Sequence, residues 1–217
     1  MSQPALSSQY LRWFQEIEKS LGALFRLFSG LCGQCYSQTM AQAVSGERAK
    51  RGYWCCCVID NQVHDHWTQL NAVQIRADRQ WYQKMKIPKD HPARRRFPGN
   101  GPCPALGPQG CQISRCRPIT CTTQLCEKML YVLAEARLIS GPIDSPRQIE
   151  DIISLPDILP ALYGCRKNQA VTAAEVQAYL AALAEFTARL ARIDVKQRRL
   201  WTDRAITRFM APERRPR

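Results

Sequence analysis

The sequence lacks the motifs by which common nucleotide-binding and hydrolytic enzymes are recognised. It contains no glycine-rich dinucleotide motif, no P-loop, no GxSxG nucleophile motif and no HExxH zinc motif. These absences exclude the easily recognised forms of nucleotide and hydrolase chemistry. They leave open whether the protein is an enzyme of another kind.

Long apolar segments are also absent. The best candidate for a membrane span, LGALFRLFSGLC at residues 21–32, is shorter than the run of about 18 apolar residues that such a helix needs, and it contains Arg26. Residues 1–20 lack the basic, apolar and small-residue regions of a secretory signal peptide. We therefore expect no transmembrane segment and a cytoplasmic location, in which thiols stay reduced.

Cysteine and positive charge are both abundant. The 217 residues include 11 cysteines, an odd number, and in a reducing compartment such clusters bind metal more often than they form disulfides. Lysine and arginine number 31 against 18 acidic residues, which gives a formal net charge of +13. That balance favours a negatively charged partner. We expect an acidic protein partner, with nucleic acid as the alternative.

Helical periodicity dominates the chain and predicts a mainly α fold. Apolar residues recur at helical spacing over residues 5–28, which indicates an amphipathic helix whose apolar side packs in the core. Further helices are expected over residues 64–87 and 122–139. Residues 88–118 are rich in proline and glycine and are expected to form a loop that cannot bury itself without an internal staple.

Capping signals predict two more helix starts. Ser145 before Pro146 predicts a helix with serine as its N-cap. Thr172 and Glu175 have the spacing of a capping box, which predicts a helical tract that continues to about Met210. We divide the chain into an N-terminal amphipathic helix at residues 1–30, a cysteine cluster domain at residues 31–170 and a basic C-terminal helical tract at residues 171–217.

The C-terminal tract carries an excess of positive charge. Residues 166–217 hold 12 basic and 5 acidic side chains. Helical spacing predicts one charged side, formed by Arg192, Lys196, Arg199 and Asp203. The side chains expected to pack inward are Leu200, Trp201, Ile206 and Phe209. The charged side is either an ordinary solvated helix surface or a contact for phosphate or an acidic protein.

The cysteines are grouped rather than scattered. Cys32 and Cys35 form a CxxC motif, a triplet follows at residues 55–57, and a second cluster lies within residues 103–121. A CxxC turn can bring two sulfurs to one ion because its backbone amides point inward and stabilise thiolates. Together the groups indicate a metal site. We therefore expect helices around an irregular, metal-stapled cysteine-rich centre.

The second cluster has a specific pattern of residue types. Cys103 is followed by Leu106, Cys111 by Ile113, and Arg117-Pro118 by Cys121. This block resembles the CxxCxxCC family of zinc- or iron-chelating proteins, also called the YkgJ-type cysteine cluster family. In that family the last cysteine precedes a polar loop and a Thr- or Ser-capped helix, and Cys165 before Thr172 is similar. In the first block the paired cysteines follow the CxxC motif about twenty residues later than in the family.

The resemblance implies eight cysteine ligands. They are Cys32, Cys35, Cys56, Cys57, Cys103, Cys111, Cys121 and Cys165. Eight sulfurs could hold two tetrahedral zinc ions, or one [4Fe-4S] cluster with the remaining cysteines structural. Some relatives, the flagellin lysine methylases, carry this block together with an iron–sulfur cluster.

Two cysteines lie outside the family pattern. Cys126 falls among apolar residues of a predicted helix and is interpreted as a buried apolar thiol. Cys116 lies between Arg115 and Arg117, which favours a lowered thiol pKa and leaves a ligand or redox role open.

Three functions are compatible with this sequence. The first is a metal-binding protein that docks on an acidic partner as scaffold, electron carrier or assembly factor. The second is an iron–sulfur-dependent modifying enzyme related to the protein lysine methylases. The third is a zinc-stabilised nucleic-acid binder. Redox activity would separate the first two from the third, which would instead show steep salt dependence.

Overall fold

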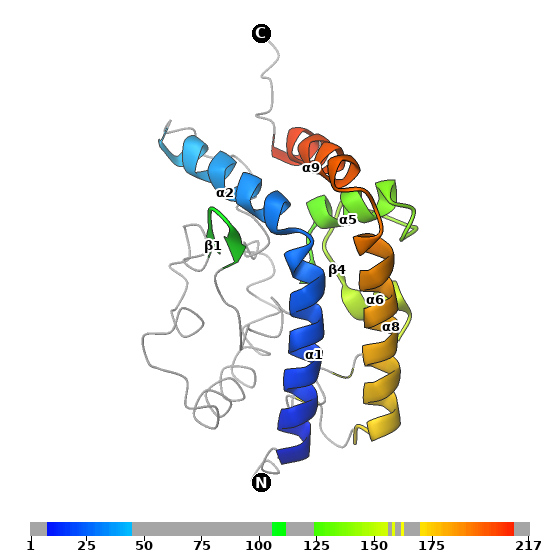
Figure 1. Cartoon of the computed structure of the whole chain (residues 1–217). Helices are drawn as coiled ribbons and strands as arrows, with labels where there is room; N and C mark the ends of the chain where they lie inside the picture. Colours follow the sequence, from blue (N-terminus) through cyan, green and yellow to red (C-terminus); the bar gives the residue numbers. More distant parts are fainter. Residues whose placement is uncertain are drawn as a thin grey trace.

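A computed structural model gives the structure of the protein and shows that its described part is mainly helical, as predicted (Figure 1). It describes residues 8–44, 106–111, 124–155, 158, 162 and 170–210. The helix expected over residues 64–87 lies outside the described residues. In the part that is described, no helix is both long and apolar enough to cross a lipid bilayer.

The N-terminal amphipathic helix is confirmed as α1, Ser8–Arg26. Phe14, Ile17, Leu21 and Leu24 recur every three or four residues, and each is at most 1% exposed. They form the buried side of α1, which packs along α8, Ala173–Ala191 (Figure 1). A hydrogen bond also joins α1 to the segment just before α8, since the Val171 N–H donates to the Tyr10 hydroxyl at 2.9 Å.

The predicted capping box at the start of α8 is confirmed. The Thr172 hydroxyl accepts from the Glu175 amide at 3.2 Å, and the Glu175 carboxylate accepts from the Thr172 amide at 2.7 Å. These bonds satisfy amide groups that a helix start otherwise leaves without an acceptor. The pKa of Glu175 is lowered first by the bond from the Thr172 backbone amide and second by the Thr172 hydroxyl, which donates to Glu175 Oε2 at 2.7 Å.

Replacing Thr172 by alanine is expected to lower the free energy of unfolding by about 1 kcal/mol at neutral pH, because the N-cap oxygen is lost. The lowered pKa of Glu175 means that its carboxylate stabilises the fold above the ordinary glutamate pKa, and that this contribution is lost as the pH falls through the folded-state value. The stability difference between the two proteins should therefore narrow in acid. Urea unfolding at neutral and acidic pH measures this difference. A difference that grows in acid would contradict the prediction.

The helical tract expected to run from residue 172 to about Met210 is two helices. Arg192 is the C-cap of α8, and α9 spans Val195–Met210. Asp194 starts α9, because its Oδ1 accepts from the amides of Lys196 at 2.8 Å and Gln197 at 3.2 Å. Helix α9 reaches Met210, the last residue of that range that the structure describes.

The break changes which side chains share a surface. Arg192 belongs to the end of α8, so it does not share a helical side with Lys196, Arg199 and Asp203, and that part of the prediction is wrong. Leu200 is 43% exposed rather than packed inward. The other predicted inward residues are buried or partly buried: Trp201, Ile206 and Phe209.

The helix expected over residues 122–139 is shorter. Gln124–Leu125 forms strand β3, and α5 spans Glu127–Glu135. Beyond α5, Arg137 adopts a left-handed conformation with φ 54°, and the Leu138 amide donates to Leu133 O at 2.9 Å. These are the features of a Schellman motif, which ends a helix.

The helix start predicted at Ser145-Pro146 is wrong. Arg147–Gln148 forms strand β4, which pairs antiparallel with β3, and α6 begins only after it, at Ile149–Ile153. Pairing with a strand that precedes α5 holds this segment extended. Tertiary pairing thus outweighs the local capping signal.

The second helix, α2, spans Ser29–Val44 and carries a short hairpin on one side (Figure 1). The hairpin consists of β1, Leu106–Gly107, and β2, Gly110–Cys111, paired antiparallel with Leu106 opposite Cys111. It lies within the region that the sequence predicts to be a loop. The loop prediction is therefore wrong for residues 106–111, which form a hairpin. The rest of residues 88–118 lies outside the described residues.

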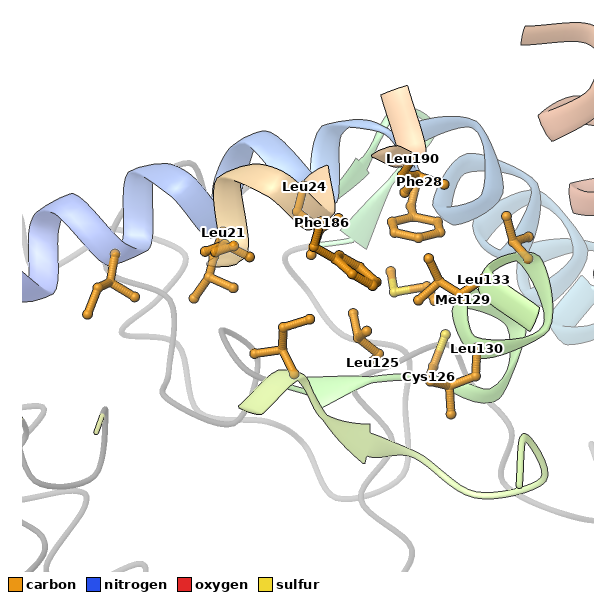
Figure 2. Packing of buried hydrophobic residues seen from close by; sticks show 14 of the residues in the cluster. Leu21, Leu24, Phe28, Leu125, Cys126, Met129, Leu130, Leu133, Phe186 and Leu190 are labelled. Atoms are coloured by element: carbon orange, nitrogen blue, oxygen red, sulfur yellow. The ribbon is translucent and has the colours of Figure 1, made fainter. Parts of the chain in front are cut away.

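A hydrophobic cluster joins the helices (Figure 2). Leu125, Met129, Leu130 and Leu133 from the β3–α5 segment meet Phe28 beneath α1 and α8. Helix α9 packs on both α5 and α2. The cluster therefore draws on residues from the N-terminal helix, the cysteine-bearing segment and the C-terminal tract. Its polar contacts include a hydrogen bond of 2.8 Å from the Tyr179 hydroxyl to Glu150 Oε1.

Candidate metal centre

Three of the eight predicted ligand cysteines lie in described elements. Cys32 and Cys35 are on α2, and Cys111 ends strand β2. The structure therefore brings two of the predicted cysteine blocks onto contacting elements. The other five predicted ligands lie outside the described residues: Cys56, Cys57, Cys103, Cys121 and Cys165.

The CxxC motif lies in a regular helix, not in a turn. The Cys32 amide donates to Phe28 O at 2.9 Å, so it is used by the helix and does not point toward a shared ion. The predicted turn is therefore wrong for Cys32 and Cys35. Residues three apart on a helix nonetheless lie on the same side, with about 5–6 Å between their Cβ atoms. That spacing suits two sulfurs that share a metal or a cluster.

The surroundings of the two sulfurs differ. Cys35 is 4% exposed and belongs to the hydrophobic cluster, whereas Cys32 is partly exposed and packs against the cluster. A helix that carries one buried and one partly exposed cysteine presents both at the margin of the core.

The hairpin that carries Cys111 packs closely on the CxxC motif. A Cβ atom added at Gly33 would lie closer than 3.0 Å to the backbone carbonyl oxygen of Pro108, in the hairpin turn. Only glycine leaves room for this approach. The glycine between the two cysteines therefore sets how near the second cysteine block comes to the first.

Sequence reasoning missed the role of Gly33. The signal that could have revealed it is a glycine inside a helical CxxC motif, where glycine lowers helix stability by about 1 kcal/mol relative to alanine. A glycine retained at such a position indicates a close neighbour. The same helix offers a contrast, since a Cβ atom added at Gly30 would meet nothing within 4 Å.

A cleft of about 570 Å³ opens between α2, the hairpin turn and α9. Gln34, which lies between the two cysteines in sequence, donates from Nε2 to Asp203 Oδ1 of α9 at 2.7 Å. The lining side chains are polar on the α2 side, where Ser37 donates to Gly33 O at 3.1 Å. The cleft therefore borders the CxxC motif directly.

Cys126 lies neither on α2 nor on the hairpin. It is 7% exposed and lies in the hydrophobic cluster with Leu125, Met129 and Leu130 (Figure 2). The predicted burial is confirmed, but Cys126 is the N-cap of α5 and not an interior helical residue. Cys116 lies outside the described residues.

The thiol donors that the described residues contribute suit zinc or iron–sulfur chemistry. Within the described ranges alone, no three cysteine, histidine, aspartate or glutamate side chains gather as a metal site would require. The predicted set of eight cysteines includes five that lie outside those ranges. No family model, curated protein or solved structure matches this chain.

Proposed function

We propose that this chain is a cytoplasmic metal-binding protein of the cysteine cluster type. Its eight candidate cysteines hold two zinc ions, or four of them hold one [4Fe-4S] cluster and the remaining cysteines are structural. The folded domain then docks on an acidic partner and serves as a scaffold, an electron carrier or an assembly factor.

One observation carries this proposal. The helix with Cys32 and Cys35 and the strand with Cys111 come from distant parts of the sequence, yet they pack against each other with Gly33 at the contact. A hairpin with strands of two residues has little surface of its own to bury. A shared metal would supply the missing stabilisation, because metal binding free energy becomes folding free energy.

The chemistry of the donors supports zinc and iron–sulfur over harder metals. Thiolates are soft ligands and select zinc, copper(I) or iron–sulfur clusters, whereas calcium and magnesium require oxygen ligands. The chain has only 3 histidines, so a cysteine-only donor set fits its composition. If eight thiolates bound two zinc ions, the formal charge would fall from +13 to about +9, so the protein would remain basic.

Metal analysis tests the proposal. Protein purified without oxygen is expected to contain iron with acid-labile sulfide, or about two zinc ions per chain. Elemental analysis and sulfide determination give the content. Parallel cultures limited for iron or for zinc control for metal taken up during purification. A metal-free protein that unfolds at the same temperature with and without a chelator would refute the proposal.

A further inference from the structure

Four of the five cations of α9 fall into two groups, and the fifth, Arg198, is partly buried. Arg204 forms an ion pair with Glu135 of α5, with a nitrogen–oxygen distance of 3.8 Å. Arg208 forms an ion pair with Asp144, which follows α5, with a nitrogen–oxygen distance of 3.4 Å. Lys196 and Arg199 are exposed and form no ion pair with any residue that the structure describes. The positive charges of Arg204 and Arg208 are therefore neutralised by nearby carboxylates, whereas Lys196 and Arg199 remain available to a charged partner.

An exposed apolar side chain lies on either side of Lys196 and Arg199. Val195 is 68% exposed and Leu200 is 43% exposed, and they are the large hydrophobic side chains left exposed in the described part of the chain. Val195 and Arg199 are four residues apart, as are Lys196 and Leu200, so the four side chains form one surface over two helical turns. We call this surface, Val195, Lys196, Arg199 and Leu200, the α9 outer face.

The α9 outer face leads to the candidate metal centre. One turn beyond Arg199, Asp203 accepts the hydrogen bond from Gln34 of the CxxC motif and lines the cleft beside it. A molecule that lies along the outer face therefore reaches the helix that carries Cys32 and Cys35. An electron carrier requires this proximity between its partner and its metal.

We propose that the α9 outer face docks an acidic amphipathic segment of a protein partner. The inference rests on the proposed function and names the surface by which that function reaches its partner. Carboxylates of the segment pair with Lys196 and Arg199, and its apolar side chains cover Val195 and Leu200. Complementary charge speeds the encounter, while the apolar contacts add affinity.

Two features favour a protein partner over a nucleic acid. The aromatic residues of α9, Trp201 and Phe209, are partly buried, and Phe209 makes an edge contact with Tyr131 at 6.2 Å, so they are not presented for base stacking. Two cations with an exposed aliphatic side chain on either side suit a peptide better than a phosphate backbone.

Peptide binding to the full-length, metal-loaded protein tests this inference. The probe is a fluorescent peptide that repeats Glu-Glu-Leu, and its binding is followed by fluorescence anisotropy. The double variant Lys196→Glu/Arg199→Glu is expected to weaken binding by at least about tenfold, because like charges then face each other. The variant Val195→Ser/Leu200→Ser should weaken binding of this peptide but leave binding of a polyglutamate peptide nearly unchanged.

A matched control separates the surface from net charge. Arg12→Glu/Lys19→Glu makes the same change in net charge at exposed positions of α1 and should retain the parent affinity. Equal loss in this control would overturn the inference. Binding of a single-stranded oligonucleotide in place of the peptide, abolished by the α9 variant, would also overturn it in favour of a nucleic-acid surface.

Metal content measured on the same samples distinguishes the two proposals. If the α9 variant loses peptide binding but retains its metal, the result supports both the docking surface and the metal centre. Selective loss in a protein that never contains metal would support the docking surface while refuting the metal centre. A metal-loaded protein that binds neither peptide would refute the docking surface alone.

Discussion

Gly33→Ala is expected to displace the hairpin of residues 106–111 from α2 and to lower the metal content of the protein. The added methyl group would overlap the Pro108 carbonyl oxygen, which is backbone and cannot move aside by a change of rotamer. We expect the free energy of unfolding to fall by about 1–3 kcal/mol, the usual cost of an overpacked contact. Metal analysis and thermal unfolding of the purified variant measure both effects.

Gly30→Ala is the matched control for this experiment. It makes the same chemical change in the same helix, where the added Cβ atom meets nothing within 4 Å. Because alanine favours helix more than glycine does, stability should rise by about 0.5–1 kcal/mol with metal content unchanged. The two substitutions should thus change the free energy of unfolding in opposite directions. Similar behaviour of both variants would show that the hairpin contact does not matter to the fold.

Cys35→Ser is expected to remove or greatly labilise the metal, because a serine hydroxyl is a far poorer ligand than a thiolate for zinc or iron–sulfur clusters. Cys32→Ser should have the same effect if the pair acts on one metal or cluster. Metal per chain, measured after a short exposure to a chelator, gives the result. The variants should also lose the stability that metal provides to the parent protein.

Cys126→Ser provides the comparison at a buried cysteine outside the predicted ligand set. Cys126 is 7% exposed and Cys35 is 4% exposed, so burial of the new hydroxyl costs a similar amount at both sites, about 1–3 kcal/mol. The Cys126 variant should keep its metal. Loss of metal from the Cys126 variant together with retention in the Cys35 variant would show that the ligands have been assigned to the wrong cysteines.

Local patterns predicted the helices that depend mainly on short-range information. The apolar spacing of α1 and the Thr172–Glu175 box of α8 are both contained within a few residues, and both are confirmed. The burial of Cys126 also followed from its apolar neighbours. In each case the residues that decide the structure are close together in the sequence.

Local patterns failed where a distant segment competes with them. The capping signal at Ser145-Pro146 is present, but Arg147–Gln148 pairs with Gln124–Leu125 and delays the helix. The CxxC motif resembles a metal-binding turn, but the helix that begins at Ser29 continues through it. Neither outcome can be deduced from the few residues that form the signal.

The sequence by itself determined the mainly helical fold, the positions of the strongest helix signals, the basic charge and the grouping of the cysteines. Only the tertiary structure decided that the hairpin ending at Cys111 packs on the helix carrying Cys32 and Cys35, that Gly33 permits this approach, and that Gln34 is bonded to Asp203. The physical reason is the range of the forces involved. Helix periodicity and capping act over a few residues, whereas steric fit and hydrogen bonds between segments far apart in sequence exist only once the chain has folded.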